Sequence, residues 1–232
     1  MVDLSGAILR DVDLSGAKIL DALLTNTEVS GMISGLRVNG VEVAPLVEAE
    51  LDRRHPERVV LRATTPSGLR EAWAVVESMW RPTIELAWRL PETARQQRID
   101  DEWSLVETLR HLIFVVDAWF GRTVLGDVEP YHRLGLTPSF LGDASALGLD
   151  LAARPSFEEV LGVRRQRMDR VGQFLATVTA DELCRPRRNN DAAGYPPATE
   201  DTVLGCLHVV MDEEWNHHQY AIRDLSILTA TT

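Results

Sequence analysis

The chain has 232 residues, of which 45% are hydrophobic and 25% charged, and its formal net charge is −11. This composition is ordinary for a globular protein with a sizeable core, and the acidic excess argues against nucleic acid, whose phosphates need clustered Lys and Arg. Two cysteines give no disulfide framework, and we find no leader-like segment and no apolar run long enough to cross a membrane. We therefore expect a cytoplasmic protein with no nucleic-acid or membrane partner.

The first thirty residues contain a repeat with a period of five. The segment "DLSGA" occurs at 3–7 and again at 13–17. Large apolar residues recur at every fifth position: Leu4, Leu9, Leu14, Ile19, Leu24 and Val29. A period of five fits neither a helix nor a strand, so it favours a repeat solenoid over the alternative of a chance Leu/Asp-rich strand.

Residues 1–43 resemble a pentapeptide-repeat segment on the strength of this pattern. The resemblance implies a short right-handed β-helix. Because so short a solenoid cannot bury its own core, we expect it to dock on the rest of the chain. Residues 44–66 are polar and punctuated by proline, which predicts a connector with one short helix around 45–54.

Four longer amphipathic helices are predicted downstream of the connector. Their expected ranges are 67–91, 103–124, 156–178 and 199–228. Ser156 precedes Glu159 at the spacing of a capping box, and Gly- and Pro-rich loops separate the helices. The chain is thus predicted to be mainly α, with an up-down four-helix bundle and long connections over residues 67–232.

The last predicted helix carries "DEEWNHHQYAIRDL", in which a carboxylate falls on the apolar face. On a helical wheel, Glu214 and His218 lie in the middle of the Leu/Met stripe, while Glu213 and His217 lie to one side. An unpaired carboxylate there would cost several kcal/mol, so we expect a compensating cation. Residues four apart share a helix face, and Glu214 and His218 could therefore bind one metal ion.

His111 is the natural third ligand, because it lies in a helix that is apolar nearly all round, "WSLVETLRHLIFVVDAWF". The predicted metal site is therefore His111, Glu214 and His218, with His217 and Glu213 as runner-up ligands or supporting residues. Two alternatives stay open: an ordinary hydrogen-bonded i,i+4 pair in a polar core, and a core histidine without a metal. Trp103 and His132 are candidates for lining a pocket.

The segments "EWSLVETLRHLI" and "EWNHHQYAIRDL" resemble the DinB superfamily of metal-binding four-helix bundles, over about residues 67–228. That resemblance implies one histidine ligand from the second helix and two ligands, four residues apart, from the last. His111, Glu214 and His218 occupy these places. With glutamate as the second of the three ligands, this set resembles the His/Glu/His ligands of mycothiol-dependent maleylpyruvate isomerases.

Two imidazoles and a carboxylate suit Zn²⁺ first, with Ni, Fe or Mn as alternatives, and three protein ligands leave an open position for catalysis. The DinB resemblance implies a thiol S-transferase or isomerase that uses mycothiol or another small thiol and a small electrophile. Cys184 and Cys206 lie in no nucleophile pattern, so no catalytic residue is assigned. A non-catalytic metal-binding bundle, a pentapeptide-repeat interaction protein and a homodimer remain open.

Overall fold

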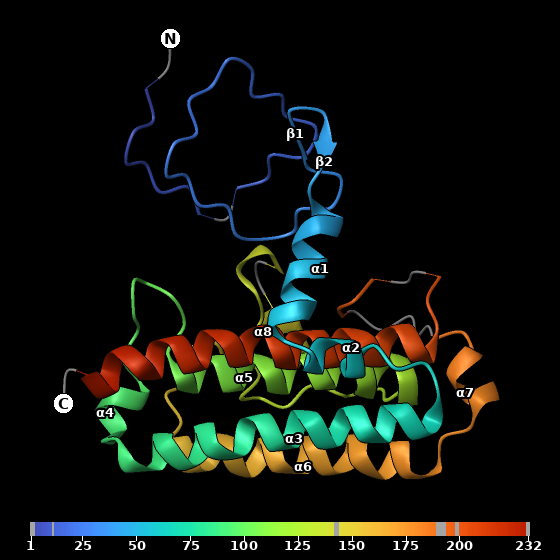
Figure 1. Ribbon diagram of the computed structural model, residues 1–232. Helices are drawn as coiled ribbons and strands as arrows, with labels where there is room; N and C mark the ends of the chain where they lie inside the picture. The colour runs from blue at the N-terminus through green and yellow to red at the C-terminus, as the bar shows by residue number, and fades with distance from the viewer. Residues whose placement is uncertain (1–2, 11, 142–143, 189–193, 198–199, 231–232) are drawn as a thin grey trace. The chain divides into compact units, whose positions relative to one another are not determined.

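A computed structural model of the chain describes residues 3–10, 12–141, 144–188, 194–197 and 200–230. The chain divides into two compact units, Met1–Arg54 and His55–Thr232, and each is described by itself. The division falls inside the predicted connector. The structure is mainly helical, and the sheet found in its described part has only two strands (Figure 1).

Tight turns recur in the N-terminal unit. Main-chain N–H groups close them onto the carbonyl three residues earlier, from Ala7 to Leu4 (2.9 Å), Ala17 to Leu14 (2.9 Å) and Thr27 to Leu24 (3.4 Å). Gly6 and Gly16 take the left-handed conformation at the third position, with φ of 72° and 73°. Asn26 takes the same conformation in the third turn, with φ of 58°, so the turns recur every ten residues.

The described residues of this segment do not show the right-handed β-helix that the repeat predicts. Leu4, Leu14 and Leu24 are all exposed. A hairpin of β1 (Arg37–Val38) and β2 (Val41–Glu42) follows, and α1 (Ala44–Arg54) is the short helix predicted for the connector. Two-residue strands give little pairing, so this unit holds its shape mainly through turns.

The second unit contains the long helices. Its elements are α2 (Glu57–Leu61), α3 (Pro66–Arg89), α4 (Glu92–Arg95), α5 (Leu105–Val115), the π-helix η1 (Val116–Leu125), the short 3₁₀ helices η2 (Ser139–Leu141) and η3 (Ser145–Leu147), α6 (Phe157–Thr177), α7 (Ala180–Cys184) and α8 (Val203–Ala230). The predicted helices correspond to α3, to α5 with η1, to α6 and to α8. None of the helices in the described part of the chain combines the length and apolarity needed to cross a bilayer.

Local capping signals set where two of the long helices begin. The predicted capping box at α6 is confirmed: Ser156 Oγ accepts from the Glu159 N–H (3.2 Å), and the Glu159 carboxylate accepts from the Ser156 N–H (2.8 Å). Ser104 and Glu107 form the same reciprocal pair at the start of α5, at 3.3 and 3.0 Å. These pairs satisfy N–H groups that the first helical turn leaves without partners.

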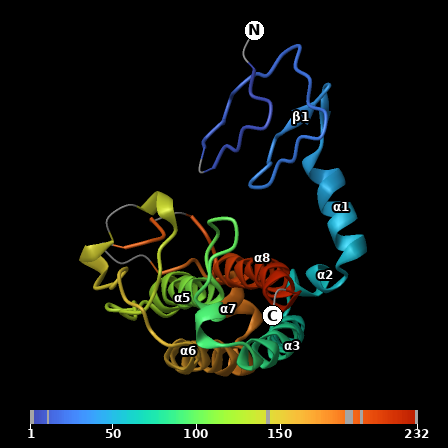
Figure 2. The ribbon, with the colours of Figure 1, turned by 90° about the vertical axis from the view of Figure 1, so that its left-hand side faces the viewer.

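The core lies where the long helices meet. α8 packs against α3, α5 and η1, and α6 packs against α3 and α5. Figure 2 looks along these helices and shows them around a common interior. Fully buried side chains from all of them fill it, among them Leu69, Val76, Leu109, Leu112, Phe157, Val160, Val203 and Met211. This packing fixes which face of α8 meets α5.

We predict that Ser104→Ala lowers the free energy of unfolding by about 1 kcal/mol, because α5 loses its side-chain cap. Urea denaturation measures this change. Ser78→Ala is the matched control: Ser78 is exposed in the middle of α3, and its substitution should change stability by less than about 0.5 kcal/mol. Equal losses in the two variants would show that the cap does not determine stability.

Candidate metal centre

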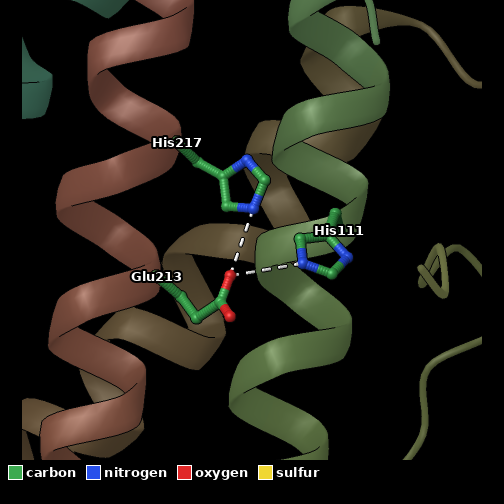
Figure 3. A group of neighbouring side chains, drawn as sticks. All are labelled: His111, Glu213 and His217. Carbon is green, nitrogen blue, oxygen red and sulfur yellow. Dashed lines mark ion pairs between the residues drawn. The ribbon is translucent and has the colours of Figure 1, made fainter. Parts of the chain in front are cut away.

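His111, Glu213 and His217 come together between α5 and α8 (Figure 3). Glu213 Oε2 lies 3.1 Å from His217 Nε2 and 3.5 Å from His111 Nε2. The two imidazole centroids are 4.7 Å apart. Glu213 and His217 share a face of α8 because they are four residues apart, and α5 presents His111 to that face.

A main-chain carbonyl orients His111. Its Nδ1 lies 3.0 Å from the Leu136 carbonyl oxygen, and since a carbonyl only accepts, Nδ1 carries the proton. Its Nε2 is left facing the Glu213 carboxylate, and a metal ion held there would take the lone pair of this nitrogen. Proteins hold metal-binding histidines in this way, with the second ring nitrogen donating to a carbonyl or carboxylate. The Trp103 ring lies against both imidazoles, with centroid distances of 4.8 Å to His111 and 6.0 Å to His217.

The electrostatics keep Glu213 ionised. Burial alone would raise the pKa of this carboxyl group, but hydrogen bonds and positive charge from His111 and His217 outweigh it and lower the pKa to about 2. A metal-binding carboxylate must be deprotonated, so the group is in the required form across the physiological range.

The donor set fits a divalent ion. Zinc bonds of about 2.0–2.2 Å place the ligands of a tetrahedral site about 3.4 Å apart. The distances from Glu213 to the two histidine nitrogens, 3.1 and 3.5 Å, lie on either side of that spacing. One ligand atom from each of the three residues lies within 4.8 Å of the other two, so small side-chain adjustments suffice.

A cavity of about 240 Å³ opens on these three side chains. Its other lining residues are Trp103, Phe114, Val115, Trp119, Pro138, Phe140, Tyr195 and Val209. Trp103 is therefore a pocket residue, whereas His132 does not line this cavity. The His132 N–H donates to Asp117 Oδ2 (2.8 Å), and its Nδ1 accepts from the Leu134 N–H (3.2 Å).

Glu214 and His218 occupy a different place from the one predicted for them. Both are buried on the core face of α8, but the structure does not bring them to His111. Arg164 of α6 holds both oxygens of Glu214, with N–O distances of 2.9 and 2.5 Å, and its guanidinium lies 4.8 Å from the centre of the Trp80 ring. The cation that offsets this buried carboxylate in the structure is an arginine.

His218 likewise has its own partners. Its Nε2 lies 2.8 Å from Thr83 Oγ1, and its ring makes an edge contact with Trp80, with centroids 5.0 Å apart. Burial lowers the pKa of His218, so the ring is neutral in this surrounding. The pair that faces His111 is thus Glu213 and His217, one residue earlier along the same helix.

Arg164 is the residue that sequence analysis missed, although the sequence carries a signal for it. The buried residues of α6 recur at helical spacing: Phe157, Val160, Arg164, Val171 and Leu175. An arginine inside such a stripe must meet an acceptor in the core, because burying an unpaired charge is prohibitive. Matching Arg164 with Glu214 would have left the flanking pair, Glu213 and His217, as the candidate ligands.

The geometry defines a helical protein with a His/Glu/His cluster at the edge of an aromatic cavity. The sequence model of the DinB superfamily matches residues 43–221, and the chain belongs to this superfamily. A search of curated proteins and a search of solved structures found no match. The matched range contains all three residues of the cluster and begins upstream of the predicted bundle.

We predict that Glu213→Gln and His217→Ala each weaken Zn²⁺ binding by more than roughly 100-fold. Loss of a hydrogen bond to a metal ligand weakens binding by only about 10–100-fold, and these variants remove the ligand itself. Isothermal titration calorimetry on protein freed of any affinity tag measures the affinity. Asp212→Asn, which neutralises the exposed neighbouring carboxylate, should leave the affinity unchanged. Normal Zn²⁺ binding by both variants, together with loss of Zn²⁺ binding in His218→Ala, would instead identify Glu214 and His218 as the ligands.

The Arg164–Glu214 pair should affect stability and not metal binding. Glu214→Gln leaves a guanidinium buried without its counter-charge, so we expect the free energy of unfolding to fall by about 3–5 kcal/mol. The double variant Arg164→Met, Glu214→Leu removes both charges and should recover most of that loss. Urea denaturation and zinc titration of the double variant test this pair of expectations. Loss of stoichiometric zinc binding in a folded double variant would contradict them.

Proposed function

We propose that the chain is a metal-dependent enzyme that activates a low-molecular-weight thiol, with mycothiol as first choice, for transfer to a small electrophile or for its isomerisation. The observation that carries the proposal is the His/Glu/His cluster with one side on a cavity, in a member of the DinB superfamily. The packing of α3, α5 with η1, α6 and α8 supports a four-helix bundle of the DinB type.

His111, Glu213 and His217 are the residues that would hold the ion, with Zn²⁺ as first choice and Ni, Fe or Mn as alternatives. A divalent ion bound there would lower the pKa of a small thiol so that the thiolate is available at neutral pH. The three protein ligands leave a position for that thiol, which is typical of a catalytic and not of a closed structural site.

The rest of the site is built from this chain's own groups. The Leu136 carbonyl fixes the ring of His111, and Trp103 covers both imidazoles. The apolar walls of the cavity lower the polarity around the reacting groups, which strengthens electrostatic interactions inside it.

The reacting thiol is external on this proposal. Neither cysteine lines the cavity: Cys184 is exposed and Cys206 is buried in the core. Burial raises the pKa of the Cys206 thiol, which disfavours the nucleophilic thiolate. A thiol bound from solution is therefore needed for the chemistry.

We predict that zinc-loaded protein conjugates mycothiol to monochlorobimane faster than thiol-free and metal-free controls, measured by fluorescence. His111→Ala should lower this rate by at least about 10²-fold, because a site that has lost a ligand no longer holds the ion that activates the thiol. Circular dichroism of this variant should be unchanged, because His111 lies at the edge of the cavity. Stoichiometric zinc without a thiol-dependent rate for mycothiol, bacillithiol or glutathione would favour a non-catalytic metal-binding protein.

A further inference from the structure

The walls of the cavity beside the cluster are almost entirely aromatic. Besides the two imidazoles, five aromatic side chains line it: Trp103, Phe114, Trp119, Phe140 and Tyr195. Val115, Pro138 and Val209 supply further apolar surface. Aromatic walls attract flat, unsaturated ligands, because rings stack on or meet one another edge to face.

The aromatic walls are already assembled around Tyr195. Its ring stacks on Phe114 with centroids 6.2 Å apart and meets the edges of Trp119 at 5.9 Å and Phe140 at 6.0 Å. A ligand that enters such a prepared surface loses less affinity to side-chain ordering than one that must assemble it.

Main-chain hydrogen bonds hold Tyr195 in this place. The Tyr131 hydroxyl donates to the Tyr195 carbonyl (2.8 Å) and accepts from the Tyr195 N–H (2.9 Å). Arg122 donates to the carbonyl of the next residue, Pro196, at 2.8 Å. Three hydrogen bonds with two side chains thus hold the residues that carry the ring, so the cavity keeps its aromatic lining without a ligand.

The charges of the cavity argue against an anionic substrate. No lysine or arginine occurs among its described lining residues, and Glu213 is the acidic one. On the proposed function, Glu213 and a thiolate together offset both charges of a divalent ion. A second anion would then lose its hydration without gaining a counter-charge, which is unfavourable.

We infer that the acceptor substrate is a neutral, flat, aromatic or conjugated electrophile and not an organic acid. This inference rests on the proposed function for the identity of the reaction, but the preference of the cavity belongs to its own walls. It distinguishes this site from one that isomerises a dicarboxylate, because such a substrate needs Lys or Arg side chains, which the described lining lacks.

Phe140 offers a way to test the cavity without disturbing the fold. It lines the cavity and is 73% exposed, so it stands at the solvent side and contributes little to the core. Val128 is similarly exposed, at 78%, and does not line the cavity. The variants Phe140→Ala and Val128→Ala are therefore a matched pair.

The experiment measures binding, so that it does not depend on turnover. The probes are 2-naphthamide and 2-naphthoate, which are unreactive, similar in shape and different in charge. Isothermal titration with metal-free protein and with zinc-loaded protein in the presence of mycothiol should show the amide binding roughly 10–100-fold more tightly in both forms. Phe140→Ala should weaken amide binding roughly 2–10-fold, and Val128→Ala should leave it unchanged.

The outcomes separate the inference from the proposed function. Equal or tighter binding of the naphthoate, or amide binding that Phe140→Ala does not weaken, overturns the inference whether or not the protein turns over a thiol. Preference for the amide in a protein that takes up no zinc would support the inference about the cavity while removing the proposed function.

Discussion

The buried ion pair between Arg164 and Glu214 sets the rotation of the last helix, and the candidate site depends on that rotation. Glu214 is fully buried, and both of its oxygens accept from the guanidinium of α6. Successive helical residues point about 100° apart, so the orientation that buries Glu214 turns Glu213 toward α5 and His111. Because breaking a buried pair costs several kcal/mol, the ion pair fixes which residues of α8 face His111 without facing it itself.

The other half of the site depends on Arg110, the residue before His111. This buried guanidinium donates to the carbonyl oxygens of Leu134, Asp150 and Ala153, at 2.9, 2.7 and 2.8 Å. The Leu136 N–H donates back to the Arg110 carbonyl (3.2 Å), and the Leu136 carbonyl meets His111 Nδ1. Arg110 therefore holds the segment that contains Leu134 and Leu136, and the Leu136 carbonyl of that segment orients His111.

Sequence reasoning reached the helices and the core face, but it placed Glu214 and His218 beside His111, where the structure places Glu213 and His217. Helix positions follow from local periodicity and caps, as at Ser156, and the wheel correctly assigned Glu214 and His218 to the buried face. A helical wheel describes one helix alone, however, and does not show which other helix packs against each of its sides. The compensating charge came from Arg164, fifty positions away, and only tertiary packing makes that pairing. In the N-terminal repeat, the period of five was visible, but the turns recur every ten residues, where Gly6, Gly16 and Asn26 take the left-handed conformation.

The face of α8 that carries Glu213 and His217 is also chemically better suited to an exchangeable ion than the core face that carries Glu214 and His218. Both carboxylate oxygens of Glu214 are engaged by Arg164, and this fully buried residue does not line the cavity that opens on Glu213. Glu213 and His217 line a cavity, so an incoming ligand can reach the position that three protein ligands leave open. Adjacent acidic residues therefore take opposite roles: the buried one needs a permanent protein counter-charge, whereas the accessible one can share an ion with solvent or substrate. The aromatic walls that lower the polarity around Glu213 also strengthen its interaction with any cation held there, since a drier surrounding screens charge less.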